Sequence, residues 1–106
     1  IIWQKAMNLV TMIYGLTSQF PREEQFGLIS QMRRAAISIP SNIAEGRRRG
    51  TNPEFKRYLL IAYGSGAELE TQYEISRRLG YIAIHESGCK NLLEEVMRML
   101  NIMSAA

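Results

Sequence analysis

Three consecutive arginines, Arg47, Arg48 and Arg49, are the residues of this chain whose type and spacing best fit a chemical role. Guanidinium groups bind phosphates through forked pairs of hydrogen bonds, so a run of three predicts contact with a polyanion. Lys56 and Arg57 follow after a short turn and extend the same positive region. The simpler interpretation is a solvated helix end, where positive charge complements the negative end of the helix dipole.

A second basic pair precedes this run. Arg33 and Arg34 come fourteen residues before Arg47 and Arg48. In an unbroken helix this spacing places the two pairs on nearly the same side, about 21 Å apart. Two basic sites at that separation can touch one nucleic-acid backbone, which makes Arg33 a further candidate contact. No aromatic residue interrupts the arginine run, so the sequence does not predict base stacking.

Short polar side chains form a stripe along the same predicted helix. Exposed helix faces usually carry longer side chains, so we favour a hydrogen-bonded network or a subunit contact over an ordinary exposed face. An arginine in such a seam needs a partner, and Glu68 and Gln72 of the next helix are the candidates. If Arg34 is paired in this way, it serves the structure and does not bind phosphate, whereas Glu45 is spaced to pair with Arg48 or Arg49. The stripe and its expected partner are Gln31, Arg34, Ser38, Ser41, Asn42, Glu45 and Glu68.

The other reactive side chains do not form a recognisable catalytic or metal site. His85 and Cys89 are four residues apart in the last predicted helix, but structural zinc needs four ligands and the chain has no other histidine or cysteine. Gly64, Ser65 and Gly66 resemble a nucleophile turn, yet no strand precedes them. Inside a predicted helix these glycines are better explained by close approach of a neighbouring helix. We therefore expect no enzyme activity, no metal site and no cofactor.

Four segments carry apolar residues at three- and four-residue steps, which predicts four amphipathic helices over about residues 2–18, 23–48, 52–79 and 84–103. Pro21 separates the first two, Pro40 predicts a kink within the second, and Gly80 ends the third. Gly88 weakens the first turn of the fourth, so Ser87 is an alternative start for that helix. Short loops join them, so we predict an all-α fold, an up-down-up-down antiparallel four-helix bundle, as a single domain over residues 1–106. The expected core positions are Trp3, Ala6, Met7, Leu9, Val10, Ile13, Leu16 and Thr17; Leu28, Met32, Ala35, Ala36, Ile39 and Ile43; Phe55, Leu59, Ala62, Gly66, Leu69 and Tyr73; and Cys89, Leu92, Leu93, Val96, Met99, Leu100 and Met103.

Charge is distributed unevenly along the 106 residues, whose net charge is +3. Residues 31–58 contain seven basic and two acidic side chains, so this part carries +5 and the remainder −2. The single cysteine rules out a disulfide within the chain and favours a reducing compartment. No apolar run approaches the roughly 20 residues of a membrane span. Lys5 interrupts the apolar start, so we expect no signal peptide there.

A series of motifs extends over nearly the whole chain except the last helix, which has only a generic pattern. They are Trp3-Gln4-Lys5-Ala6, Phe20-Pro21, Glu24, Gly27-Leu28, Gln31, Arg33-Arg34-Ala35-Ala36, Ser38-Ile39-Pro40-Ser41-Asn42-Ile43-Ala44-Glu45-Gly46, Phe55, Leu59, Ala62, Gly64-Ser65, Glu68-Leu69-Glu70-Thr71 and Leu79-Gly80-Tyr81. Together they resemble the bacterial four-helix bundle proteins that are also called 23S rRNA intervening-sequence proteins. The block from Gln31 to Gly46 is the most specific part of this resemblance.

The resemblance implies a cytoplasmic, non-enzymatic bundle that assembles as a ring-like homopentamer. Open reading frames of this family occur in insertions within ribosomal RNA genes, and similar accessory proteins of diversity-generating retroelements engage nucleic acid and a reverse transcriptase. The family brings no proven binding residues, but its members often have a single Arg where this chain has Arg47, Arg48 and Arg49. We therefore expect a homo-oligomer that binds RNA or DNA through its arginines; the alternative is a structural or protein-interaction scaffold.

Overall fold

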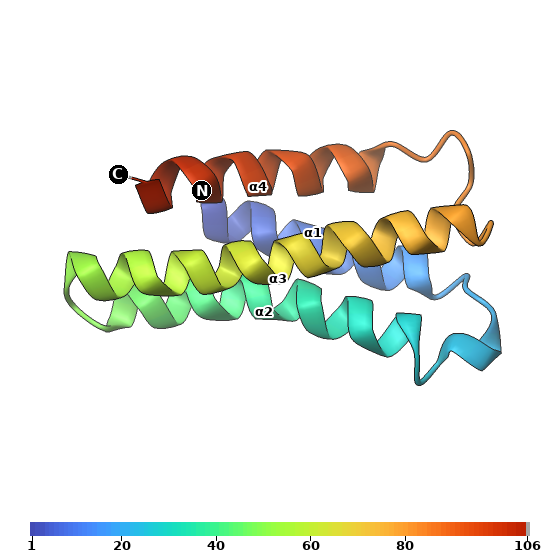
Figure 1. The fold of residues 1–106 in the computed structure, drawn as a ribbon, viewed down its shortest axis with the longest axis horizontal. Helices are drawn as coiled ribbons and strands as arrows, with labels where there is room; N and C mark the ends of the chain where they lie inside the picture. The colour runs from blue at the N-terminus through green and yellow to red at the C-terminus, as the bar shows by residue number, and fades with distance from the viewer. Residues whose placement is uncertain (106) are drawn as a thin grey trace.

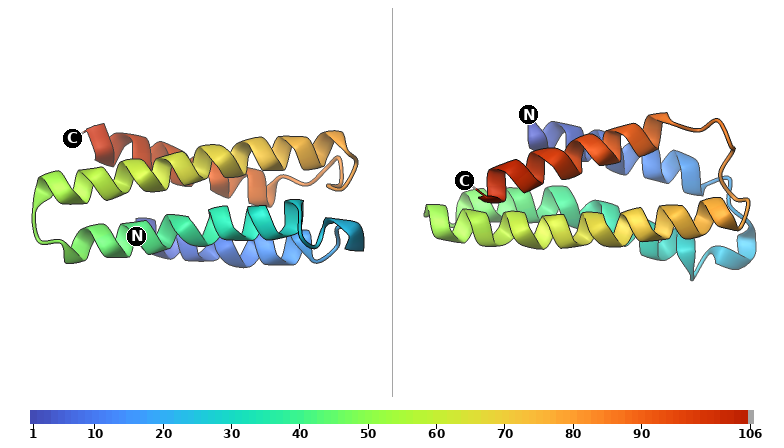
Figure 2. Two further views of the ribbon diagram at one scale, coloured as in Figure 1. Left: turned by 60° about the horizontal axis from the view of Figure 1, so that its bottom comes forward. Right: turned by 45° about the horizontal axis from the view of Figure 1, so that its top comes forward.

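The structure, a computed structural model, describes residues 1–105 as four α-helices and one short 3₁₀ helix. Helix α1 spans Ile2–Thr17, α2 spans Leu28–Arg48, α3 spans Asn52–Arg78 and α4 spans Gly88–Ala105, while the 3₁₀ helix η1 spans Arg22–Glu24 (Figure 1). Successive helices run in opposite directions (Figure 2). Each α-helix packs against the helices next to it in the sequence, and α1 and α4 pack against each other. The predicted up-down-up-down four-helix bundle is confirmed.

The buried side chains come mostly from the predicted stripes. In α2, Met32, Ala36, Ile39 and Ile43 are fully buried. The stripe of α1 is narrower than predicted, because this helix packs only against α2 and α4 and leaves its remaining apolar side chains outside. Trp3 and Met7 are therefore 39% and 41% exposed. The core also includes Met97 of α4, which the prediction missed.

The second helix begins five residues later than predicted, at Leu28 rather than Glu23. The carboxylate of Glu24 explains the late start: Oε1 accepts a hydrogen bond from the Leu28 N–H at 3.2 Å, and Oε2 accepts one from the Tyr81 hydroxyl at 3.0 Å. Tyr81 also packs against buried Phe20, with ring centroids 5.4 Å apart. The α1–α2 connection is therefore held against the α3–α4 connection, and η1 occupies the segment that was predicted as helix.

The last helix begins at Gly88, after Ile84 but within one residue of Ser87, the alternative start that the sequence indicated. Glu86 occupies the preceding loop and accepts hydrogen bonds from the Tyr73 hydroxyl and, at 2.9 Å, from the Cys89 N–H. The second bond satisfies a backbone donor that has no partner in the first turn of a helix. Helix α2, by contrast, stays continuous through the buried Pro40.

The α2–α3 hairpin extends past both chain ends at one end of the rod, whose longest dimension is 43 Å (Figures 1 and 2). Gly50 makes the turn with φ +85°, a conformation that favours glycine. Thr51 then starts α3, and its Oγ1 accepts a hydrogen bond from the Glu54 N–H at 3.4 Å. These two residues fix the place where the arginine run meets the next helix.

Candidate nucleic-acid interface

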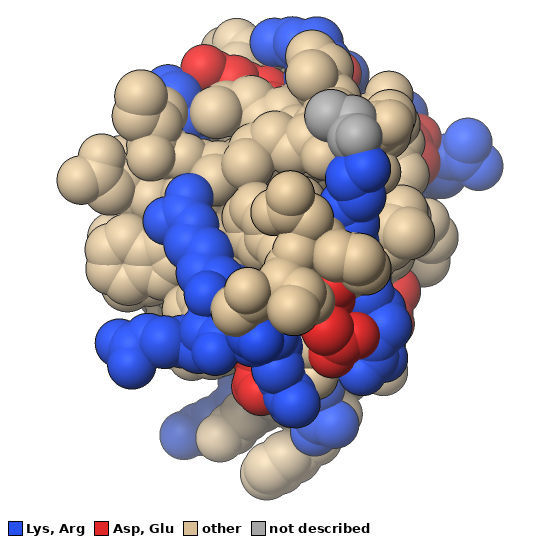
Figure 3. All heavy atoms as spheres, turned by 90° about the vertical axis from the view of Figure 1, so that its left-hand side faces the viewer, with Lys and Arg blue, Asp and Glu red and all other residues tan. Residues whose placement is uncertain are grey.

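Five basic side chains gather at the end of the α2–α3 hairpin, and we call them the hairpin tip. Two lie in the last turn of α2, one directly after it and two in the first turns of α3: Arg47, Arg48, Arg49, Lys56 and Arg57. All four arginines are exposed. Figure 3 shows this end of the molecule with Lys and Arg side chains spread over its surface and few acidic ones between them.

Two of the tip arginines have carboxylate partners within the subunit. Arg49 lies 2.9 Å from Glu45, and this hydrogen bond is the main cause that raises the pKa of Arg49. Arg57 lies 3.3 Å from Glu54. Both pairs are exposed, and such pairs contribute little to stability and exchange readily for other ligands. Five positive and two negative charges leave the tip with a net charge of +3.

The other two arginines of the run have no acidic partner. Within residues 1–105, neither Arg47 nor Arg48 forms an ion pair. Arg48 also makes no hydrogen bond in that range. The charge of Arg48 is thus available to an external anion without the loss of an internal contact, and that of Arg47 without the loss of an ion pair.

Aromatic rings from α3 lie under these arginines, a feature that the sequence analysis missed. The guanidinium of Arg49 lies 5.1 Å from the ring centroid of Tyr58, and that of Arg57 lies 4.9 Å from the same centroid. Arg47 lies 6.0 Å above the ring of Phe55. The arginine run itself contains no aromatic residue, so only the fold of the hairpin brings these rings to it. The available signal was their place in the first two turns of α3, directly after the Gly50 turn.

Arg33, the other predicted nucleic-acid contact, lies outside the tip and has partners within the subunit. Its Nε donates a hydrogen bond to Thr17 Oγ1 at 2.9 Å, and a terminal nitrogen donates to the Tyr14 carbonyl at 3.3 Å. The guanidinium also lies 4.3 Å from the centre of the Tyr14 ring. Arg33 therefore joins α2 to the end of α1, and it does not pair with Glu68 or Gln72.

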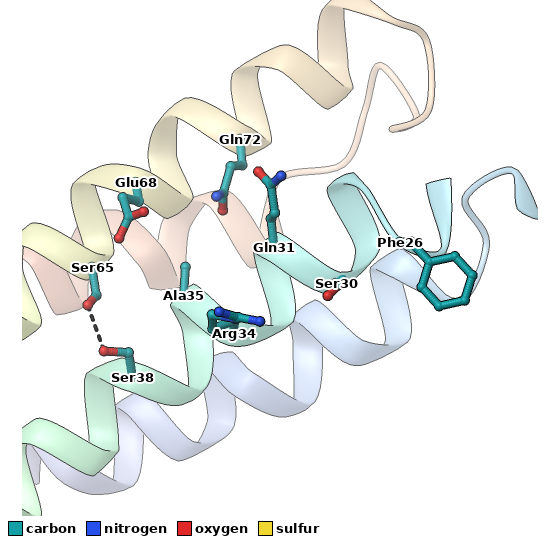
Figure 4. Close-up of a pocket in the computed structure, with 9 residues that line it drawn as sticks. All are labelled: Phe26, Ser30, Gln31, Arg34, Ala35, Ser38, Ser65, Glu68 and Gln72. Carbon is teal, nitrogen blue, oxygen red and sulfur yellow. Dashed lines mark hydrogen bonds between the residues drawn. The ribbon is translucent and has the colours of Figure 1, made fainter. Parts of the chain in front are cut away.

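Part of the predicted polar stripe, together with its expected partner Glu68, lines a groove of about 470 Å³ between α2 and α3, which we call the polar groove (Figure 4). Ser41, Asn42 and Glu45 do not line it, and Ser41 lies in a groove on the other side of α2. At its floor the hydroxyls of Ser38 and Ser65 are 2.7 Å apart. Asn42 Nδ2 donates to the carbonyl and to the hydroxyl of Ser38, at 2.8 and 2.9 Å. The residues that line the groove are Phe26, Ser30, Gln31, Arg34, Ala35, Ser38, Ser65, Glu68 and Gln72. The hydrogen-bonded part thus comprises two predicted residues, Ser38 and Asn42, together with Ser65, which had not been assigned to it.

The polar groove also contains polar groups without partners among residues 1–105. Arg34 and Glu68 both line it, but they form no ion pair in the described part of the chain. Gln31 and Gln72 point toward one another in Figure 4, yet Gln72 Oε1 is buried and accepts no hydrogen bond from residues 1–105. An unsatisfied buried acceptor costs roughly 1–3 kcal/mol. The groove therefore offers a site for an additional hydrogen-bond donor.

On the other side of α2 lies an apolar groove of about 350 Å³. Its lining residues are Trp3, Met7, Val10, Ile37, Pro40, Ser41 and Ala44. Ile37 is 42% exposed, and it lines a neighbouring pocket together with exposed Phe26, which lies in the connection before α2. The outer face of α2 is thus bordered by a polar groove toward α3 and by an apolar one toward α1.

The structure separates the two side chains that were considered as metal ligands. Cys89 is buried in α4. His85, which was predicted to lie in the same helix, is exposed in the loop before it. Across residues 1–105, no three His, Cys, Asp or Glu side chains are grouped to hold a metal ion. None of the helices in this range is long and apolar enough to cross a membrane.

These features define a four-helix bundle with a protruding basic hairpin. The chain belongs to the 23S rRNA-intervening sequence protein family, whose pattern matches residues 1–102. A crystal structure from Bacteroides thetaiotaomicron, of a protein with unknown function from the S23 ribosomal protein family, has the same fold. The two are 22% identical, the match covers 100% of both chains, and the TM-score is 0.88. No curated protein matches the sequence.

Proposed function

We propose that this chain forms a non-enzymatic, cytoplasmic homo-oligomer, a pentamer, that binds RNA through the hairpin tip. The observation that carries this proposal is the position of Arg47 and Arg48, exposed at the protruding end of the rod without acidic partners among the described residues. Such charges bind phosphate by releasing counterions, which requires no particular sequence. The name of the family connects it with an intervening sequence of 23S rRNA, which supports RNA over DNA as the polyanion.

Self-association is supported by the outer face of α2. Its apolar groove leaves Trp3, Met7 and Ile37 about 40% exposed, and its polar groove contains the unsatisfied acceptor of Gln72. A second copy of the chain that covered this face would bury these three apolar side chains and supply a hydrogen-bond donor to Gln72. The pentameric state itself comes from the family resemblance.

A titration of RNA and duplex DNA across a salt series tests the binding proposal. The variant with Arg47, Arg48 and Arg49 all changed to Ser should bind RNA more weakly. The slope of its log affinity against log salt concentration should become shallower by about 0.7 for each single-strand phosphate contact that is lost. The matched control changes Arg77 and Arg78 to Ser, because these exposed arginines lie at the other end of α3 and both pair with Glu74. Equal effects of the two variants would refute a role for the tip.

The alternative is a structural or protein-interaction scaffold that binds no nucleic acid. It is favoured by the internal partners of Arg49 and Arg57, which have a carboxylate and the Tyr58 ring within the subunit. In that case the parent protein would bind neither RNA nor DNA at low salt, and the triple Ser variant would behave like the parent.

A further inference from the structure

A small hollow lies at the hairpin tip, between the last turn of α2 and the first turn of α3. It measures about 250 Å³ and is lined by Gly46, Arg47, Gly50, Thr51, Asn52 and Phe55. Pockets for drug-sized ligands measure roughly 300–1,000 Å³, so this one fits a single flat ring system better than a larger molecule. A Cβ at Gly50 would meet no other atom within 4 Å, so that side of the hollow is open.

The Phe55 ring is held firmly beside this hollow. A Cβ at Gly46 would lie 3.1 Å from Phe55 Cδ1 and 2.7 Å from Tyr58 Cβ. The absence of a side chain at Gly46 therefore allows α3 to pack directly on the backbone of α2 at this point. Phe55 is half-buried, so part of the ring stays available at the hollow.

The spacing between Phe55 and Arg47 is wider than a direct stacking contact. The guanidinium lies 6.0 Å from the ring centroid, compared with 4.3 Å for Arg33 over Tyr14. A flat base stacked on Phe55 at about 3.5 Å, with a guanidinium at the same distance on its other face, needs only about 1 Å more. Arg47 is exposed and has a flexible side chain, so it can move by that amount.

We propose that this hollow holds one unstacked base of single-stranded RNA, between the ring of Phe55 and the guanidinium of Arg47. This inference rests on the proposed function and adds a preference for single-stranded over duplex RNA. Bases in a duplex are stacked on each other and cannot enter the hollow. Single-stranded RNA is recognised in this way elsewhere, by stacking of splayed bases on aromatic rings and guanidinium planes. Asn52 also lines the hollow, and an amide can hydrogen-bond with the edge of a base.

The test compares single-stranded and duplex RNA of equal length at one salt concentration. The parent should bind the single strand more tightly, and Phe55→Leu should weaken that binding about tenfold while duplex binding stays the same. Phe55→Tyr keeps a ring and should keep the preference. Thermal unfolding of each variant checks that the bundle remains folded.

A second variant covers the case in which Phe55→Leu disturbs the hairpin. Asn52→Leu keeps the shape of the side chain but removes its amide, and it leaves the ring and every arginine in place, so it should reduce the preference for the single strand. Equal binding of both RNA forms by the parent, or an unchanged preference in both Phe55→Leu and Asn52→Leu, would overturn the base site and leave the proposed function standing. If the parent binds neither form, the proposed function itself fails.

Discussion

Glu86 shows how a single side chain organises a connection that local patterns do not reveal. Its carboxylate accepts hydrogen bonds from the Tyr73 hydroxyl and the Cys89 N–H, so it joins α3, the loop and the start of α4. The pKa of Tyr73 rises well above its usual range, because the ring is desolvated by burial and its hydroxyl donates to Glu86. Tyr73 therefore remains a neutral donor at every physiological pH.

The buried thiol of Cys89 provides a first prediction about a single residue. Burial, and to a lesser degree the charge of Glu86, raise the pKa of the thiol from 9.0 to about 12. Because the thiolate is the reactive form, each unit of pKa lowers the reactive fraction tenfold at pH 8. We expect the native protein to react with Ellman's reagent about a thousandfold more slowly than the same protein in guanidinium chloride. Rapid reaction of the native protein would show that the start of α4 opens readily.

The acidic residues of α3 predict opposite effects of pH. Hydrogen bonds from Arg77 and Arg78 lower the pKa of Glu74 from 4.5 to about 2. A lowered pKa in the folded state adds stability above the unfolded pKa, and this is lost as pH falls through the folded one. The melting temperature of Glu74→Gln should thus lie below that of the parent at pH 7, and the gap should close between about pH 4.5 and 2.

Glu70 is the matched control for this experiment. Burial first, and then the charge of Glu94, raise its pKa, so its ionised form is disfavoured in the folded state. Its contribution has the other sign: it favours folding at low pH and opposes it as pH rises above the unfolded pKa. Glu70→Gln should therefore melt above the parent at pH 7 and equally at pH 3. A destabilised Glu70→Gln at pH 7 would contradict this assignment.

At the scale of the helices, two glycines in the middle of α3 have different roles. Gly66 is buried against α4, and a Cβ there would lie 2.2 Å from the Met97 sulfur. Gly64 faces solvent, with nothing within 4 Å of an added Cβ. The predicted close approach of a neighbouring helix is therefore confirmed at Gly66 but not at Gly64.

Alanine at these two positions should have opposite effects on stability. Gly66→Ala forces the Met97 side chain, which is only 7% exposed, to repack at a cost of about 1–3 kcal/mol. The gain in helix propensity of about 0.5–1 kcal/mol offsets part of this cost, so the net destabilisation should be at most about 2 kcal/mol. Gly64→Ala adds only helix propensity and should stabilise it by about 0.5–1 kcal/mol. Urea unfolding, monitored by circular dichroism, measures both. A neutral Gly66→Ala would show that α4 shifts away from α3 at little cost.

The helices were predictable because their signal is local, whereas their starts depend on distant contacts. Apolar periodicity placed all four α-helices, but Glu24 meets Tyr81, which is 57 residues further along the chain. No pattern around residue 24 reveals that partner. The same limit applies to the site: the arginines were visible as a run, while Phe55 and Tyr58 reach them only after the hairpin closes. Arg33 matched the spacing of a phosphate contact, but two of its nitrogens donate hydrogen bonds to Thr17 and Tyr14 of α1.

At the scale of the whole molecule, the rod separates its charge from its apolar surface. The basic tip is at one end, and the apolar groove lies along the side formed by α1 and α2. Copies related by a rotation axis along the rod would place all their tips at one end of a ring. The net charge of +3 at each tip would then act as a multivalent surface, and its RNA affinity would exceed that of a single tip.

Two isoleucines with equal exposure test whether this side of the rod is the subunit contact. Ile37 lies in the apolar groove and is 42% exposed, whereas Ile75 lies on α3 outside it and is 43% exposed. Sedimentation of the parent should show a particle of five 12.1 kDa chains. Ile37→Lys should dissociate it, because an unpaired ammonium in a covered apolar contact is strongly disfavoured, and Ile75→Lys should leave it intact. A parent that sediments as a monomer at micromolar concentration refutes the assembly, and dissociation by Ile75→Lys alone moves the contact to α3.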